Sequence, residues 1–160
     1  MRIDQQGPLI DKIKETLDQM IGPGWALTCQ ETTTSYESKL DVGTWDLTRD
    51  PYVRHTSDNL DRARGPIASF HLYPMINCCG ICVSTGSRVH KDFQKLGLGT
   101  LLNTLRIDIA RNLGYGLLLC TDVESNEPQR KILQKNGWRD IHKFINPRTK
   151  NTVIISCINL

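Results

Sequence analysis

The stretch "HKDFQKLGLGTLLNTL", His90 to Leu105, places two glycines, Gly97 and Gly99, at the start of a segment with a helical apolar pattern. Apolar residues recur after them at spacings of three and four, which predicts an amphipathic helix over about 98–113. They are Leu98, Leu101, Leu102, Leu105, Ile109 and Leu113. Glycine costs about 1 kcal/mol relative to alanine within a helix, so two of them at its beginning indicate a backbone requirement.

The segments on either side of this helix predict strands. "CCGICVSTGSRV" (78–89) precedes it, and "YGLLLCT" (115–121) follows it as a short, continuously apolar run. Such a run is typical of a strand that is buried on both faces. A strand, a helix of four turns and a second buried strand predict a right-handed βαβ unit with parallel strands.

The rest of the chain predicts a mixed α/β domain without repeats. We expect helices over 8–21 and 126–136, and further strands over 25–34, 66–75, 138–145 and 152–160. A turn at Ile76-Asn77 joins the strand 66–75 to the strand 78–89. Residues 41–65 are polar and weakly periodic, and predict a long surface excursion with a short helix around 57–63.

Composition excludes several classes of protein. The 160 residues are 39% hydrophobic and 23% charged, which suits one globular domain with its own core. A net charge of +3 without a clustered Lys/Arg stripe argues against a nucleic-acid partner. No apolar run reaches the roughly 20 residues that span a bilayer, and the N-terminus lacks the apolar core of a signal peptide. We expect a cytoplasmic monomer or homodimer with no membrane partner.

Six cysteines occur, at positions 29, 78, 79, 82, 120 and 157. Without an export signal we expect reduced thiols rather than disulfides. Cys79 and Cys82 form a single C-x-x-C, which could belong to a metal or redox site. A zinc site needs a second ligand pair, and a redox motif needs a strand-to-helix junction. The motif lies inside a strand-like run, so we favour packing residues and expect no metal.

The glycine stretch fits an anion site at a strand-to-helix junction. Amide groups of a first helical turn have no intrahelical partner, and the helix dipole adds about half a positive charge. A P-loop would need Lys-Ser/Thr after the second glycine, and a dinucleotide fingerprint would need glycine where Leu102 stands. A tight turn without a ligand is the alternative interpretation of Gly97 and Gly99.

The remaining pattern is Val89-x-x-x-Phe93-Gln94-x-x-Gly97-x-Gly99. It resembles the acyl-CoA-binding signature of the GNAT superfamily of N-acyltransferases, usually written Q/R-x-x-G-x-G/A. "NEPQRKILQKNGW" (126–138) resembles the family's segment in which Asn opens a short helix that closes on Gly and an aromatic residue. The resemblance covers about 66–160, whereas 1–65 diverges and is expected on the acceptor side of one domain spanning 1–160.

The resemblance implies a fold and an activity. The fold is a single-domain mixed α/β sheet with splayed central parallel strands and flanking helices. The activity is the transfer of an acetyl group from acetyl-CoA to a primary amine of a small molecule or protein, directly in a ternary complex. A catalytically silent acyl-CoA-binding or interaction domain is the alternative.

The resemblance also implies the residues that bind CoA. The backbone of Val89 and the side chain of Asn126 would hold the pantetheine arm, although Asn126 also suits a helix cap. Lys95 and Arg130 are the nearest basic candidates for the CoA phosphates, and a solvated face is the alternative for both. Loop amides would hold the pyrophosphate, at Gln94, Lys95, Leu96, Gly97, Leu98, Gly99 and Thr100.

The proton carriers that are frequent in the family are missing here. No Asp or Glu occurs between Pro66 and Lys91, so the usual carboxylate base is absent, and Leu133 stands where the family often has a tyrosine acid. The candidate catalytic residues are therefore His71, Asp122 and Glu124. The other candidates, each of which also suits an ordinary strand residue, are His90, Tyr73, Ser84, Ser87 and Cys120.

Overall fold

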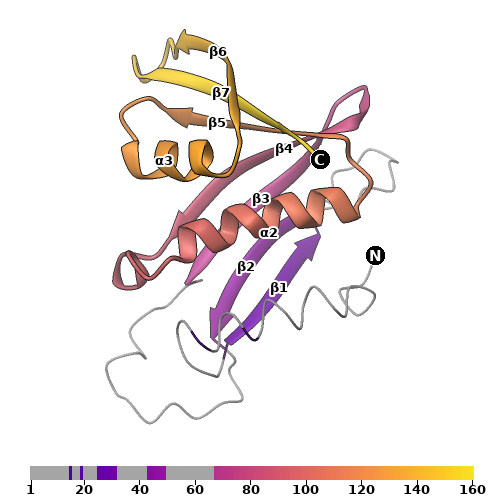
Figure 1. The fold of residues 1–160 in the computed structure, drawn as a ribbon, viewed down its shortest axis with the longest axis vertical. Coiled ribbons are helices and arrows are strands. Elements are labelled where there is room, and N and C mark those ends of the chain that lie inside the picture. Colours follow the sequence, from indigo (N-terminus) through magenta and orange to yellow (C-terminus); the bar gives the residue numbers. More distant parts are fainter. Residues whose placement is uncertain (1–14, 16–18, 20–24, 32–42, 50–66) are drawn as a thin grey trace.

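The computed structural model describes Glu15, Gln19 and residues 25–31, 43–49 and 67–160. Seven strands form one sheet in the order β1-β2-β3-β4-β5-β7-β6, with two helices lying against it (Figure 1). The strands are β1 (Trp25–Glu31), β2 (Gly43–Arg49), β3 (Ala68–Met75), β4 (Cys78–Val89), β5 (Leu117–Val123), β6 (Arg139–Ile145) and β7 (Thr152–Asn159). The helices are α2 (Leu98–Asn112) and α3 (Glu127–Lys135).

The centre of the sheet is forked. β4 and β5 are parallel, but their register covers only Ile81–Ser84 against Leu117–Cys120. Beyond these four pairs β4 continues beside β3, and β5 continues beside β7. The splayed central parallel strands expected from the sequence are therefore present, and the fork opens after the pair Ser84–Cys120.

A β-bulge lies where β4 leaves β5. Three residue steps on β4, from Thr85 to Arg88, face two steps on β3, from His71 to Ser69. Gly86 has a φ of +62°, and a Cβ built on it would lie 2.3 Å from Cδ2 of His71. Only glycine satisfies both the backbone angle and this contact. Because a bulge bends its strand, this glycine is placed where β4 must turn away from β5.

The core lies between one face of the sheet and the two helices. Phe70 and Leu72 of β3 and Cys82 and Leu118 of β4 and β5 are fully buried. The helices contribute the remaining apolar residues, chiefly Leu98, Leu102, Leu105, Ile109 and Leu133. Figure 1 shows α2 running across β3 and β4, with α3 beside the other branch of the fork.

Most of the elements expected from the sequence are confirmed, and one expectation is wrong. Residues 43–49, placed in a surface excursion, form β2 between β1 and β3. Its partners lie far away in sequence, and the polar–apolar alternation of "TWDLT" covers only five residues within a long polar segment. Glu15 and Gln19 are helical. The rest of the expected helix 8–21, the end of strand 25–34 and the helix 57–63 lie outside the described residues.

The described part of the chain contains no helix that combines the length and apolar character needed to cross a membrane. Cys79 is exposed and Cys82 is buried on β4. Residues three apart on a strand point to opposite faces, so this C-x-x-C does not present its two thiols together. Among the described side chains, no three His, Cys, Asp or Glu residues form a group suited to a metal ion.

Candidate active site

The loop between β4 and α2 is anchored at the end that follows β4. A single 3-10 turn, Lys91–Phe93, follows β4, and Phe93 is buried in the core. Nε2 of Gln94 donates to the carbonyl oxygen of Val89 at 3.3 Å, which ties the loop to the end of β4. The buried Phe93 side chain and the Gln94–Val89 hydrogen bond therefore fix the position at which residues 95–99 begin.

Five consecutive amides in this loop, Lys95 to Gly99, donate to no group in the part of the chain that the structure describes. The two flanking amides differ, since that of Gln94 donates to Lys91 at 3.4 Å and that of Thr100 donates to Gly97 at 3.0 Å. The predicted set of loop amides thus divides into five that are free to bind a ligand and two that already have a partner. We call residues 95–99 the amide cradle.

The backbone of the amide cradle has the conformation of an anion site. Lys95 and Gly97 are in the left-handed region, with φ values of +64° and +84°. Alternation with left-handed residues turns successive amides toward one concave surface, which binds anions. Gly97 is also the N-cap of α2, whose first turn carries no acidic side chain, so the helix dipole is not compensated there.

Gly99 lies at the contact between the two helices. A Cβ built on Gly99 would lie 3.1 Å from Cδ1 of Ile132 in α3. The neighbour that occupies the room at position 99 is therefore a side chain of this protein. Gly97 serves the backbone turn, and Gly99 serves the contact between α2 and α3.

Asp122 and Asn126 lie at the open side of the fork. Asp122 follows the last β4–β5 pair, and its Oδ1 accepts from the amide of Val123 at 2.9 Å and from Nδ2 of Asn126 at 3.0 Å. Its Oδ2 is buried and has no partner among the described residues. Burial raises the pKa of Asp122, opposed by the hydrogen bonds from Asn126 and Val123. Asn126 begins α3, but its side chain does not cap the helix.

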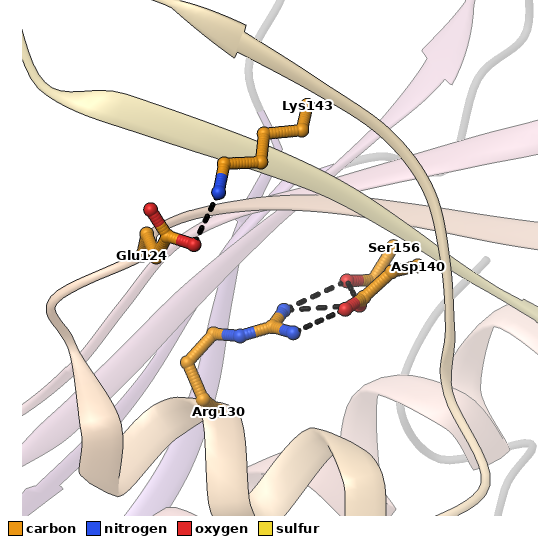
Figure 2. Close-up of polar contacts among 5 residues, drawn as sticks. All are labelled: Glu124, Arg130, Asp140, Lys143 and Ser156. Carbon is orange, nitrogen blue, oxygen red and sulfur yellow. Dashed lines mark hydrogen bonds and ion pairs between the residues drawn. The ribbon is translucent and has the colours of Figure 1, made fainter.

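Arg130 and Glu124 are engaged in ion pairs inside the protein (Figure 2). Arg130 is 9% exposed, forms a two-point ion pair with Asp140 and donates to Oγ of Ser156 at 3.3 Å. The hydrogen bond from Arg130 holds the pKa of Asp140 below its ordinary value. Glu124 pairs with Lys143 of β6. Arg130, predicted for the CoA phosphates, and Glu124, predicted for catalysis, are therefore both paired with residues of this chain.

His71 lies on the sheet face opposite α2. It alternates along β3 with the buried Phe70 and Leu72, its ring stacks on Tyr73 with centroids 6.0 Å apart, and its edge covers Gly86 of the bulge. Asp122 shares the helix-covered face with Cys120, because residues two apart on a strand point the same way. The two candidate proton carriers therefore lie on opposite faces of the sheet beside the fork.

One buried charge near the fork was missed by the sequence analysis. Arg106 of α2 is 2% exposed, and its guanidinium lies 4.7 Å from the centre of the Trp138 ring. A signal for it existed, since Arg106 follows Leu102 by four residues and Leu98 by eight, which places it on the apolar face of the helix.

No family model and no curated protein matches the sequence. Solved structures do match, at 12–16% identity and with TM-scores of 0.55–0.60. The ribosomal-protein-S18-alanine N-acetyltransferase from Escherichia coli has a TM-score of 0.60 at 14% identity, over 84% of this chain and 93% of that one.

Two further matches were solved with ligands. A Bacillus subtilis acetyltransferase in complex with CoA has a TM-score of 0.58 at 13% identity, over 85% of this chain and 99% of that one. A GNAT family acetyltransferase from Elizabethkingia anophelis with acetyl-CoA bound has a TM-score of 0.58 at 16% identity, over 86% and 99%. The forked sheet and the match to these structures agree: the chain has the fold of the GNAT acetyltransferases.

Proposed function

We propose that this protein transfers the acetyl group of acetyl-CoA to a primary amine by direct transfer in a ternary complex. The observation that carries the proposal is the amide cradle, five consecutive unpaired amides at the start of α2 beside an open fork in the sheet. Such a cradle suits a diphosphate, because several N–H groups and the helix dipole act on the same anion.

The fork suits the pantetheine arm of CoA. Beyond Ser84, β4 pairs only with β3, so its other edge presents N–H and C=O groups toward the gap. Val89 ends this edge. Across the gap, Oδ1 of Asn126 accepts no hydrogen bond within the described chain, so it can accept from a pantetheine amide. Lys95 is exposed beside the cradle and supplies charge for the phosphates.

Arg130 and Glu124 are left out of this scheme. The guanidinium of Arg130 is saturated by Asp140 and Ser156, and the carboxylate of Glu124 is held by Lys143. Moving Arg130 to a ligand would leave Asp140 and Ser156 without this partner, which is unfavourable. The Glu124–Lys143 pair is exposed to solvent and weaker.

The transfer needs a neutral amine. For an amine with a pKa near 10.4, removing the proton at pH 7 costs about 4–5 kcal/mol. We assign this proton to His71, which lies on the face opposite the helices beside the bulge. The amine nitrogen then bonds to the thioester carbon, and the carbonyl electron pair moves to oxygen, where amides of β4 can stabilise it.

The intermediate decays when the carbon–sulfur bond breaks and its electron pair leaves with sulfur, and the nitrogen, which still carries one proton more than the product amide, releases that proton to solvent. The thiolate finally takes a proton, and Asp122 is the candidate donor. Burial raises its pKa, and its Oδ2 lies buried at the open side of the fork without a partner among the described residues.

A catalytically silent acyl-CoA-binding domain is the second candidate, and one observation favours it. Leu133, at the position where the family often carries a tyrosine, is 1% exposed and belongs to the hydrophobic core. It cannot donate a proton. A protein that kept the amide cradle and lost catalysis would have this combination.

Calorimetry with CoA and acetyl-CoA, followed by thiol release from acetyl-CoA with a panel of amines and peptides, tests both candidates. We expect binding of both ligands, and an increase in unfolding free energy of about 2.7 kcal/mol at a ligand concentration of 100 times Kd. We also expect thiol release with at least one amine. No heat with either ligand rejects both candidates, and binding without release for any acceptor selects the silent domain.

A further inference from the structure

A row of three side chains crosses the sheet at the last point where β4 and β5 are paired. Ser84 of β4 lies opposite Cys120 of β5, and Cys120 lies opposite Ser156 of β7. Both serines are buried on the helix-covered face, and each accepts a hydrogen bond from an arginine. Arg106 of α2 donates to Ser84, and Arg130 of α3 donates to Ser156.

The two arginines differ in one respect, which is their counterion. Arg130 is paired with Asp140. Arg106 has no carboxylate within ion-pair distance in the described part of the chain. Its donors reach Oδ1 of Asn103 at 2.6 and 3.2 Å and Oγ of Ser84 at 3.5 Å. Burial lowers its pKa, but a guanidinium keeps its proton near neutral pH.

The surroundings of Arg106 are rich in donors that lack acceptors. Nδ2 of Asn103 and Nε1 of Trp138 are buried without a partner among the described residues, and both residues contact the guanidinium. The other charged or titratable groups that act here are Cys120, Asp122 and Arg130. Buried donors without acceptors are rare and call for an explanation. A negative charge arriving near them during the reaction would provide one.

The position of Arg106 matches the inner end of a ligand whose diphosphate lies in the amide cradle. Arg106 follows Leu98 by eight positions, which places its Cα about 12 Å along the axis from the first residue of α2, and its side chain extends back toward Asn103. At this level β4 and β5 meet, at Ser84 and Cys120. A pantetheine arm that entered the fork from the amide cradle would therefore end beside Ser84 and Cys120.

Resting on the function proposed above, we propose that the Ser84 hydroxyl and the buried charge of Arg106 stabilise the thiolate that leaves when acetyl-CoA is cleaved. Ser84 accepts from Arg106, so its own hydrogen is free to point elsewhere, and no acceptor for it occurs among the described residues. That hydrogen donates to the sulfur as the carbon–sulfur bond breaks and the electron pair moves to sulfur. Arg106 acts through Ser84 and is a positioning residue.

This arrangement accounts for catalysis with Leu133 at the position where the family often has a tyrosine acid. A leaving thiolate that is stabilised by a buried cation and a hydroxyl does not need a tyrosine to protonate it at the moment of cleavage, because a hydrogen bond to an ionised group is about twice as strong as a neutral one. Protonation then follows as a separate step.

The test measures the ionisation of the thiol of bound CoA, by the ultraviolet absorbance of the thiolate as pH is raised, together with kcat and KM for acetyl-CoA. Ser84→Ala should reduce the ionisation constant of the bound thiol about tenfold relative to wild type, and kcat by a similar factor, with KM nearly unchanged. Arg106→Gln keeps hydrogen bonding without the charge and should act in the same direction. Ser84→Thr keeps the hydroxyl and should restore both quantities.

Ser156→Ala is the matched control. It removes a buried hydroxyl from the same row, bonded to the arginine that already has a counterion. We expect lower stability but an unchanged bound thiol. An equal change in Ser156→Ala and Ser84→Ala, or no change in both Ser84→Ala and Arg106→Gln, overturns the inference while CoA binding stands. Absence of CoA binding to the wild-type protein refutes the proposed function itself.

Discussion

Two glycines at the ends of α2 have the same backbone conformation and different surroundings. Gly97 precedes the helix and Gly114 follows it, and both have a φ of +84°. Gly114 ends the helix in the manner common for glycine, and a Cβ there would meet open space. Gly97 lies within the amide cradle. At the scale of the residue, the same backbone angle therefore ends the helix at Gly114 and shapes the amide cradle at Gly97.

This pair provides a controlled test of the cradle. Aspartate is among the residues that tolerate the left-handed region best, so Gly97→Asp and Gly114→Asp carry similar backbone strain and the same charge. We expect Gly97→Asp to abolish the calorimetric response to CoA, because a carboxylate beside the five amides would repel and displace a diphosphate. Gly114→Asp should bind CoA as the wild type does. Equal affinity of the two variants would show that the diphosphate lies elsewhere.

At the scale of the element, α2 and α3 are set against each other by Gly99 and Ile132. The gap between them accepts a hydrogen at position 99 but crowds a methyl group, since the nearest atom would be 3.1 Å away. That atom is the terminal carbon of a half-buried side chain, which can move by a few tenths of an ångström. The spacing of the helices therefore depends on one side chain and one missing Cβ.

A double-mutant cycle measures this dependence. Gly99→Ala increases helix propensity, but its methyl group crowds Ile132. These two effects oppose each other, so this substitution alone should change the unfolding free energy by less than about 1 kcal/mol. Ile132→Val removes the crowded atom at a cost of about 0.5–1.5 kcal/mol. Combined, the two substitutions should be more stable than the sum of their effects by at least about 0.5 kcal/mol in urea unfolding. Additive effects would mean that the two positions do not compete for space.

At the scale of the whole molecule, the fork divides the sheet into two branches. α2 packs on the branch with β3 and β4, whereas α3 is tied to the branch with β5, β7 and β6 by the ion pair of Arg130 with Asp140 (Figure 2). Only four residue pairs join the branches along the parallel strands. The position of each side of the fork therefore depends mainly on the contacts between the helix and the strands of its own branch.

Asp140→Asn tests the tie between α3 and its branch. It leaves the buried Arg130 without a counterion, so we expect a loss of about 1–3 kcal/mol at pH 7, less than for a fully buried pair because the Asp140 side chain is 45% exposed. The folded state lowers the pKa of Asp140, so its contribution is present above the ordinary value of 3.8 and is lost as pH falls through the folded value.

The difference between wild type and Asp140→Asn in urea unfolding should therefore shrink between pH 7 and about pH 3. Glu127→Gln is the control, because Glu127 forms an exposed pair with Lys131 on the same helix and should cost less than about 0.5 kcal/mol. A difference that stays constant with pH would mean that Asp140 acts through packing and not through its charge.

The sequence by itself determined what depends on neighbours along the chain. The strand, the glycine turn and the helix that follow one another at 78–113 were predictable because capping, periodicity and left-handed turns are local, and with them came the amide cradle. Tertiary structure decided what depends on residues far apart: the pairing that makes β2 a strand, the ion pair of Arg130 with Asp140, the contact between Gly99 and Ile132, and the hydrogen bond from Arg106 to Ser84. Each of these is set by a partner that lies close only after the sheet has formed, so no pattern within a single segment contains it.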